Sequence, residues 1–186
     1  MYVDGEPVRM QIAAMGDDAD PLADGSGKTK IAWVSEYLLM DNHRMNPSNA
    51  LGGWEKSEMR TYLRETIFPD IPAVIRGAIK EVTKYTKIFN VSGDVVNDVE
   101  STDTVWIPSY REVTGGSACE TTGVVYTGLF SSADLRKKSK PGSASAVPWW
   151  TRSIHSSGVF YSITGEGNAI GNKPSRNLGV TLGFCT

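Results

Sequence analysis

The sequence predicts an α+β domain in which small antiparallel sheets are joined by long irregular segments. Three observations support this fold class. The last fifth of the chain alternates strand-like segments with polar turns. Residues 54–68 carry the clearest helical pattern. Nineteen glycines among 186 residues indicate many tight turns and loops.

The N-terminal part of the chain is predicted to contain two strands. Residues 7–15 (PVRMQIAAM) have the apolar content of a strand, and residues 30–39 favour a strand through Val34. The interval 16–28 between them is acidic and rich in glycine, which indicates a loop.

Residues 54–68 are predicted to form the main helix. Pro69 is expected to end this helix, and four apolar residues share one of its faces: Met59, Tyr62, Leu63 and Ile67. Pro72 and the apolar residues after it indicate a second, shorter helix with proline in its first turn.

The middle of the chain is predicted to hold two more strands on either side of an acidic loop. Residues 80–89 are rich in β-branched and aromatic residues, which favours a strand. Residues 93–102 are acidic and indicate the loop, and residues 104–107 follow as a short strand. Ser109 and Glu112 have the spacing that is typical of a capping box at a helix start.

Two segments rich in glycine, serine and threonine, residues 115–128 and 131–146, are predicted to be irregular. Long irregular segments within a compact domain often carry function. Residues 136–140 (RKKSK) form the one basic cluster of the chain. Because this cluster lacks interleaved aromatic residues and the chain has a net charge of −2, nucleic acid is not an expected partner.

The C-terminal fifth is predicted to consist of strands that carry polar loops. The predicted strands are residues 149–153, 159–164 and 178–185, and the loops between them are residues 154–158 and 165–177. Rigid strands that hold adaptable polar loops are the usual basis of a recognition surface.

This C-terminal segment is the candidate for a ligand-binding surface, although its composition alone favours an ordinary β-meander. It is rich in tyrosine, serine and asparagine, which antibody paratopes also use. Alternation along the strand places Tyr161 on the face opposite Phe160. The alternative is an ordinary β-meander with solvent-exposed loops. The candidate ligand-binding residues are Ile154, His155, Ser156, Ser157, Val159, Tyr161, Glu166, Asn168, Asn172, Lys173, Arg176 and Asn177.

The composition is that of a soluble globular protein, with 40% hydrophobic and 22% charged residues. A length of 186 residues suits one domain and is short for two. No apolar run approaches the length of a membrane span, so no membrane span is expected. The first residues lack the basic and apolar regions of a signal peptide.

Two short motifs suggest nucleotide or metal chemistry but lack residues that this chemistry requires. Residues 25–29 (GSGKT) end like a phosphate-binding loop, yet Leu22 stands where that motif needs glycine. The aspartates within residues 17–24 lack the spacing of an EF-hand, whose twelfth position, counted from Asp18, would be Thr29. An irregular calcium site stays open there as an alternative. Otherwise the sequence predicts no metal and no cofactor.

The sequence offers no complete set of residues for nucleophilic or zinc catalysis. The two histidines, His43 and His155, have neither a nucleophile elbow nor zinc-ligand spacing near them. Cys119 and Cys185 are expected to be small buried hydrophobes, with one disulfide between them as the alternative. Glycoside hydrolysis needs two carboxylates that meet in space, and 21 acidic residues leave that alternative open. The sequence therefore favours a binding module over an enzyme.

Aromatic residues that flank the regular elements are expected in the core. Trp54, Trp149 and Phe184 are predicted to be mostly buried, with Trp106 packed near them. Arg152 points to the opposite face from its two neighbours in the strand, and we expect it to hold an acidic side chain structurally.

Several motifs resemble those of a C-type-lectin-fold family of bacterial and phage proteins. They are WWTRS at Trp149–Ser153, LGVTLGFC at Leu178–Cys185 and GGWEKSEMR at Gly52–Arg60, with DGSGK and HRMNP upstream. The resemblance covers about Val8 to Thr186. The family is similar in fold to the variable proteins of diversity-generating retroelements and, more distantly, to formylglycine-generating enzymes.

The resemblance implies a C-type-lectin-like fold for a single domain of residues 1–186, in which the first and last strands pair and bring the termini together. It implies a non-catalytic domain on a phage tail tip or a bacterial cell surface, diversified by a retroelement, that binds a cell-surface protein or glycan of a host or neighbouring cell. It places the variable, ligand-facing residues between the two C-terminal motifs. Two alternatives stay open: an enzyme related to formylglycine-generating oxidases, which use a cysteine pair, and a structural virion module.

Overall fold

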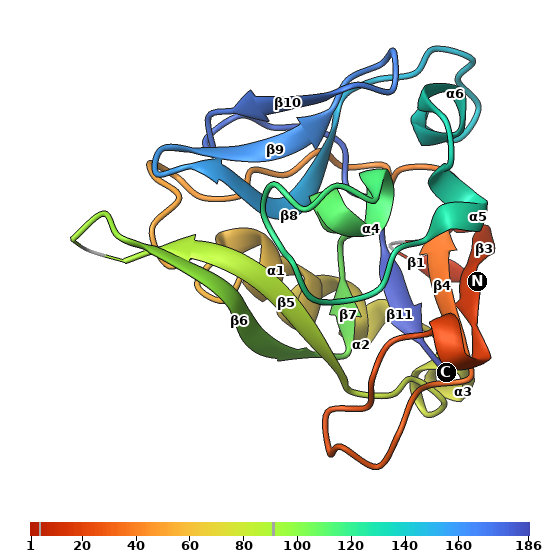
Figure 1. Cartoon of the computed structure of the whole chain (residues 1–186). Helices are drawn as coiled ribbons and strands as arrows, with labels where there is room; N and C mark the ends of the chain where they lie inside the picture. The colour runs from red at the N-terminus through yellow and green to blue at the C-terminus, as the bar shows by residue number, and fades with distance from the viewer. Residues whose placement is uncertain (4, 91) are drawn as a thin grey trace.

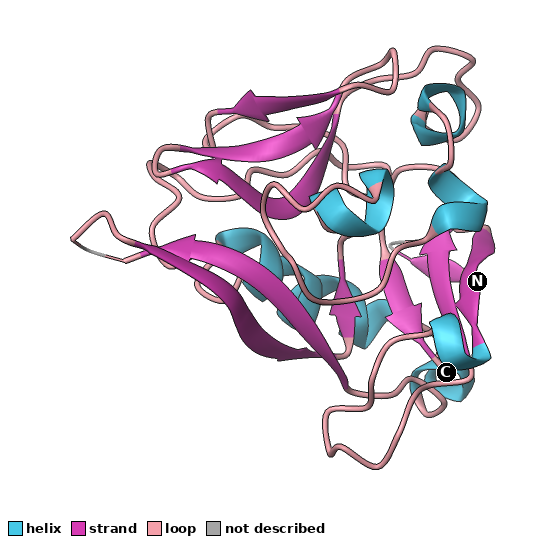
Figure 2. Cartoon of the chain, viewed as in Figure 1, coloured by secondary structure: helices cyan, strands magenta, loops and turns pink. Residues whose placement is uncertain are grey.

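The computed structural model describes residues 1–3, 5–90 and 92–186, and it has an α+β architecture of small antiparallel sheets with few helices (Figure 1). Short helices and long loops lie between and around the sheets (Figure 2). A four-stranded sheet has the order β3-β4-β11-β7. Its strands are β3 (Met10–Met15), β4 (Ile31–Ser35), β11 (Gly183–Cys185) and β7 (Val105–Trp106).

The expected pairing of the first and last strands is wrong, because β4 lies between β3 and β11. Residues 31–35 are almost entirely apolar, and Ala32 and Val34 are fully buried, which suits a strand flanked on both sides. The termini still lie close together, since Met1 and Thr186 line the same shallow groove. The letters N and C in Figure 1 mark the two chain ends on the same side of the molecule.

The closing strand is shorter than predicted for residues 178–185. Residues 178–182 are buried but run between the two larger sheets: Leu178 bridges to His43, and Gly179 bridges to Trp149. A Cβ atom on Gly179 would lie 2.4 Å from a methyl group of Leu38, so this passage requires glycine.

A three-stranded sheet forms from the C-terminal part of the chain, in the order β10-β9-β8. Its strands are β8 (Trp149–Ser156), β9 (Val159–Ile163) and β10 (Ala169–Asn172). The first strand therefore continues three residues beyond the predicted end at Ser153, and the predicted loop 165–177 contains β10. The antiparallel partner β9 supplies hydrogen bonds that extend these strands into polar sequence.

A two-stranded ribbon pairs β5 (Val82–Phe89) with β6 (Val95–Asp103), which corrects the predicted acidic loop over 93–102. Most of β6 is exposed, so its sequence lacks the apolar alternation by which strands are recognised. Its regularity comes from hydrogen bonding to β5. A short hairpin of β1 (Tyr2–Val3) and β2 (Glu6–Pro7) precedes β3.

The main helical segment begins four residues later than predicted and passes through Pro69. Ser57 caps it by accepting a hydrogen bond from the Arg60 N–H. It then runs through α1 (Glu58–Tyr62), a π-helical segment η2 (Leu63–Ile67) and α2 (Phe68–Asp70). The π-helical turns directly precede Pro69, whose ring would clash with the carbonyl four residues back in a regular α-helix.

The remaining helices are short. The capping box at Ser109 and Glu112 is confirmed at the start of α4 (Tyr110–Thr114). The others are η1 (Gly16–Asp18), α3 (Ala73–Arg76), α5 (Thr127–Phe130) and α6 (Ala133–Arg136). Among the described residues, no helix has the length and apolar composition to cross a bilayer.

The aromatic core agrees with the prediction. Trp54, Trp106 and Trp149 are fully buried, and Phe184 is 3% exposed. Trp106 lies in β7 beside β11, where a Cβ atom on Gly183 would be 2.2 Å from its ring. The Trp149 indole N–H donates to the carbonyl of Arg136 at 3.0 Å, which anchors the loop before the three-stranded sheet.

Replacing Trp149 with alanine is expected to lower the free energy of unfolding by about 3–5 kcal/mol, because it removes a fully buried aromatic side chain and leaves a cavity. Urea denaturation measures the difference. Val74, which is 85% exposed, provides the matched surface variant Val74→Ala, for which the change should stay within about 0.5 kcal/mol. A Trp149→Ala protein with wild-type stability would contradict this account of the core.

Candidate functional site

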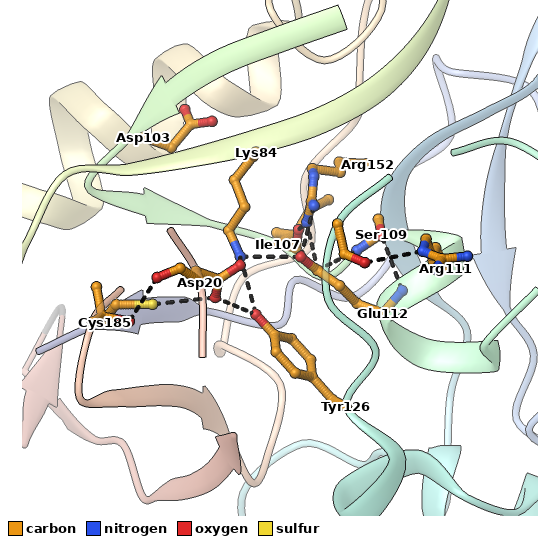
Figure 3. Close-up of polar contacts among 12 residues, drawn as sticks. Asp20, Lys84, Asp103, Ile107, Ser109, Arg111, Glu112, Tyr126, Arg152 and Cys185 are labelled. Atoms are coloured by element: carbon orange, nitrogen blue, oxygen red, sulfur yellow. Dashed lines mark hydrogen bonds and ion pairs between the residues drawn. The ribbon is translucent and has the colours of Figure 1, made fainter. Parts of the chain in front are cut away.

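A buried cluster of charged side chains lies between the sheets, with the Lys84 ammonium at its centre (Figure 3). Its Nζ atom lies 2.6 Å from Asp20 Oδ1, 3.0 Å from Glu112 Oε1 and 3.0 Å from the Tyr126 hydroxyl. Nζ also lies 3.5 Å from the centre of the Trp106 ring, a cation–π contact. All of these side chains are at most 3% exposed, so solvent does not screen their attraction.

Arg152 completes the cluster and confirms the expectation that it holds an acid. Its guanidinium binds Glu112 through two bonds of 2.6 and 2.7 Å, and it donates to the Ile107 carbonyl at 2.8 Å. The residues around it form a bulge, because three residues of β8 between Trp150 and Ile154 oppose the single residue Tyr161 in β9. Bulges redirect side chains out of a sheet, and this one turns Arg152 toward α4.

Charge pairing determines the ionisation of the cluster. Burial alone raises the pKa of Glu112, but the neighbouring Arg152 and Lys84 charges outweigh it and lower that pKa to about 2. Burial and the Asp20 carboxylate raise the pKa of Tyr126 well above its usual value. Two cations therefore face two carboxylates in the interior. This balanced arrangement joins β5, α4 and β8, and its primary role is structural.

From the sequence, Arg152 was expected to hold an acid and Glu112 to be a helix-capping residue. Their pairing was not predicted, and neither were Lys84, Asp20 and Tyr126 as members of the cluster. The signal for Lys84 was present in the alternation of β5, where Val82, Lys84 and Thr86 are all buried. A lysine on the inward face of a strand requires buried anionic partners.

A second arrangement, which we call the aromatic ledge, consists of Tyr110, Tyr161 and His155. The Tyr110 and Tyr161 ring centres are 4.4 Å apart, and those of Tyr161 and His155 are 4.7 Å apart with their planes at 66°. His155 is exposed and the two tyrosines are partly exposed. Gly171 in β10 lies directly opposite: a Cβ atom there would be 3.2 Å from the His155 ring. The ledge is thus a row of at least partly exposed rings carried by β8, β9 and α4.

A buried carboxylate lies in the chain segment next to the ledge. Both carboxylate oxygens of Glu120 are buried, and the Ser153 side chain, the Arg152 charge and the Arg111 backbone act on this group from nearby. Burial raises the pKa of Glu120, and burial together with Glu120 raises the pKa of the Cys119 thiol to about 12. A thiol with so high a pKa is not a nucleophile at neutral pH. The Cys185 thiol has its pKa raised as well, by burial and the nearby Asp20.

The structure brings half of the predicted ligand-binding residues together. The β8–β9 turn lies at one end of the three-stranded sheet, and Lys173 lies at that same end because its neighbour Asn172 pairs with Phe160. The six residues at this end are His155, Ser156, Ser157, Val159, Tyr161 and Lys173, and all are at least partly exposed. Tyr110, which the sequence did not indicate, joins them from α4.

The other predicted residues do not belong to this surface. Ile154 is fully buried because it pairs with Phe160 on the inner face of the sheet, and Asn172 is 7% exposed and donates to Ser162. Both corrections follow from the extension of β8 and the presence of β10. Two residues lie at the opposite end of the sheet, in the β9–β10 turn: Glu166 and Asn168.

Arg176 and Asn177 follow β10 in a separate segment. The Arg176 guanidinium donates to the buried Asn172 side chain at 2.5 Å, which gives this arginine a structural contact. The segment is tied to a distant loop, since the Pro174 carbonyl accepts hydrogen bonds from Met45 and Asn46. Both Arg176 and Asn177 are exposed.

Two of the N-terminal aspartates and the basic cluster also make contacts within the fold. Asp20 turns inward to Lys84, while Asp24 accepts a hydrogen bond from the Ser26 N–H in an exposed turn. The described residues hold no group of three or more side chains arranged to bind a metal. In the basic cluster, the Lys138 and Lys140 ammonium groups donate to backbone carbonyls of residues 35–40. Burial lowers the pKa of Lys138 to about 7.

Comparison with known proteins identifies one family. The sequence model of a family described as a domain of unknown function (DUF6273) matches residues 28–185. The matched range runs from β4 through β11 and includes the aromatic ledge and every member of the charged cluster except Asp20. No curated protein and no solved structure matches the chain.

Replacing Glu112 with glutamine is expected to lower the free energy of unfolding by about 3–5 kcal/mol, because it leaves the Arg152 guanidinium buried without its counter-charge. The matched control is Glu58→Gln, which breaks the more exposed pair with Arg44 and should cost about 1 kcal/mol or less. Denaturant titration of the three proteins measures both changes. Equal effects of the two variants would show that the buried cluster contributes no more than a surface pair.

The Glu112→Gln variant is also expected to differ from the wild type in its sensitivity to acid. The pKa of Glu112 is lowered from 4.5 to about 2, so its ionised form stabilises the fold fully above about pH 5 and progressively less as the pH falls to 2. Glu112→Gln should therefore lose less stability than the wild type between pH 5 and pH 2. Melting temperatures of both proteins across that pH range measure the difference in stability. Parallel curves of melting temperature against pH would contradict the lowered pKa of Glu112.

Proposed function

The chain belongs to the DUF6273 family, and we propose that it is a single, non-catalytic ligand-binding domain of residues 1–186. Its recognition surface is the aromatic ledge with the adjoining β8–β9 turn. The observation that carries this proposal is the ledge itself: the rings of Tyr110, Tyr161 and His155 contact one another in a row and remain accessible. Aromatic rings with a polar rim supply large contact area at little entropic cost, which is typical of recognition surfaces.

The polar residues at the rim of this surface differ in burial from the apolar residues behind it. Ser156, Ser157 and Lys173 beside the rings are exposed. Behind them, Phe160 and Ile154 are fully buried in the inner face of the sheet. A rim that makes few contacts with the rest of the chain can change its side chains without cost to the core, which is the property that a variable binding surface needs.

The state of the cysteines and of the charged cluster supports a non-catalytic role. Cys119 and Cys185 are both free and buried, and the pKa of each thiol is raised by burial. An oxidase of the formylglycine-generating type would use a reactive cysteine pair, so these thiols favour the binding module. The charged cluster is almost fully enclosed by the protein, which suits a structural role better than contact with a substrate.

The proposed fold relationship is C-type-lectin-like. Small antiparallel sheets, one principal helical segment, long irregular segments and neighbouring termini support it. The separation of β3 and β11 by β4 is a departure from the pairing of first and last strands that the resemblance implies. The sequence motifs at residues 52–60, 149–153 and 178–185 carry the rest of the proposal.

The proposed setting is a phage tail tip or a bacterial cell surface, where the domain binds a protein or glycan of a host or neighbouring cell. This part of the proposal rests on the sequence resemblance to variable proteins of diversity-generating retroelements. A reverse-transcriptase gene beside the coding sequence, with a near-duplicate of its 3′ end, would support diversification. A coding sequence among virion genes without either feature would favour a structural virion module.

A display library tests the proposed surface. Six exposed or partly exposed positions are randomised together: His155, Ser156, Ser157, Val159, Tyr161 and Lys173. A matched control library randomises six exposed positions on and before the main helical segment: Glu55, Lys56, Thr61, Arg64, Glu65 and Thr66. Both libraries are sorted first for folded protein by protease resistance and then for binding to a panel of bacterial surface proteins and glycans.

We expect most members of the first library to fold and to yield specific binders at least tenfold more often than the control library, because only the first set includes ring positions of the aromatic ledge and the exposed residues beside them. If most members of the first library unfold, these residues are scaffold. If the two libraries yield binders equally often, the ledge has no special role in recognition.

A further inference from the structure

Asp98 occupies an unusual place in the exposed ribbon. In the pairing of β5 with β6, Thr86 opposes Val99 and Ile88 opposes Val96, so Asn97 and Asp98 form a bulge opposite the single residue Lys87. Asp98 has a φ of 51°, and it is the one non-glycine residue with positive φ that the structure describes. Backbone strain of this kind persists where other contacts hold it and is concentrated at functional positions.

The bulge directs the Asp98 carboxylate toward a distant loop. One carboxylate oxygen accepts hydrogen bonds from the Thr121 and Thr122 N–H groups at 2.9 and 3.0 Å, and the other accepts the Thr121 hydroxyl. Burial raises the pKa of Asp98, but these bonds outweigh it and lower the pKa. Bonds to an ionised acceptor are the strong class of hydrogen bond, so this contact is a substantial anchor.

The loop that Asp98 holds, residues 115–125, is here called the strap. It contains no helix or strand, and glycines with positive φ stand near its two ends, Gly115 at 73° and Gly123 at 100°. Beyond the Asp98 bonds, the Gly123 carbonyl accepts a bond from Arg111, and the strap is followed by Tyr126, whose N–H bonds to the Glu112 carbonyl. The centre of the strap is thus held by the Asp98 carboxylate, by the Lys87 ammonium, which donates to the Ala118 carbonyl at 3.3 Å, and by the burial of Cys119 and Glu120.

The strap separates two cavities. An outer cavity of about 360 Å³ is lined by Tyr85 and by residues 122–125 of the strap, together with the N-terminal loop. A small inner cavity of about 10 Å³ is lined by Thr122–Val124 as well, and by Lys84, Glu112 and Arg152 of the charged cluster. Three strap residues, together with Pro21 and Tyr85, line both cavities and therefore form the partition between the outer space and the buried charges.

We propose that the strap is a gate, latched by Asp98, that controls access from the outer cavity to the charged cluster. When latched, it encloses Lys84, Glu112 and Arg152 with room for about one water molecule. When residues 121 and 122 leave the Asp98 carboxylate, the two cavities join. The cationic and anionic side chains of the charged cluster then become accessible to a small polar molecule. The proposal stands apart from ligand binding at the aromatic ledge.

Three variants separate the latch from backbone flexibility. Asp98→Gly removes the carboxylate and keeps the positive φ without strain, since glycine adopts that conformation freely. Asn97→Gly adds the same freedom to the same bulge and leaves the latch intact. Asp98→Asn keeps one acceptor oxygen without the charge and should give an intermediate result.

Chemical labelling provides the readout, because each cysteine reports on a different region. Cys119 lies within the strap, whereas Cys185 lies in the central strand β11, and both are buried. Iodoacetamide labelling of the native protein, followed by mass spectrometry, measures the two thiols separately. Acetic anhydride labelling of Lys84 measures access to the charged cluster, with buried Lys138 as the reference amine.

In Asp98→Gly we expect Cys119 and Lys84 to be modified about 10- to 100-fold faster than in the wild type, while Cys185 and Lys138 are unchanged. Asn97→Gly should match the wild type. Parallel acceleration at Cys185 would mean general destabilisation and overturn the proposal. Acceleration at Cys119 without Lys84 would show a loose strap that is not a gate. Unchanged labelling at both would show that Asp98 is not the latch.

Discussion

The Glu112 carboxylate is the point on which the interior of this protein depends. It accepts the Ser109 N–H within its own helix, Lys84 from β5 and two bonds from Arg152 in β8. Lys84 and Arg152 are separated from Glu112 by 28 and 40 residues along the chain, respectively. In a region of low dielectric constant, an ion pair is stabilising only when it is complete, so the ribbon, α4 and the three-stranded sheet must assemble together. This requirement gives a protein with small sheets and much loop a defined core.

Two β-bulges give the charged residues their positions. In β8 the bulge turns Arg152 toward Glu112, and in β6 another bulge turns Asp98 toward the strap. A regular strand presents its side chains alternately to two faces. In both of these strands the bulge instead directs a charged side chain sideways, toward a segment far away in sequence. The bulge in β8 places Arg152 in the core, where the Arg152 and Glu112 side chains are at most 3% exposed. The bulge in β6 places Asp98 beside the exposed residues Thr121 and Thr122. The first contact is therefore shielded from solvent, whereas the second lies near the surface.

The three-stranded sheet separates its core contacts from the proposed recognition surface. Its inner face carries Phe160 and Ile154, which are fully buried, and its outer face and turn carry the aromatic ledge with an exposed polar rim. Mutations on the rim therefore change few contacts of the core. This division suits the proposed ligand-binding role, because β8, β9 and α4 hold the rings while the polar side chains around them are exposed.

The sequence alone determined the features that depend on local pattern. The capping box at Ser109, the short strand at residues 105–106 and the burial of the tryptophans follow from spacing and hydrophobicity within a few residues. Arg152 was correctly expected to hold an acid, but its partner was not identifiable. Tertiary structure decided the strand order, the existence of β6 and the inward role of Lys84, and it separated Ile154 and Asn172 from the exposed surface. The physical reason is that local pattern encodes tendencies to be buried or to turn, whereas hydrogen bonding between strands and pairing of charges depend on residues brought together only by the folded chain.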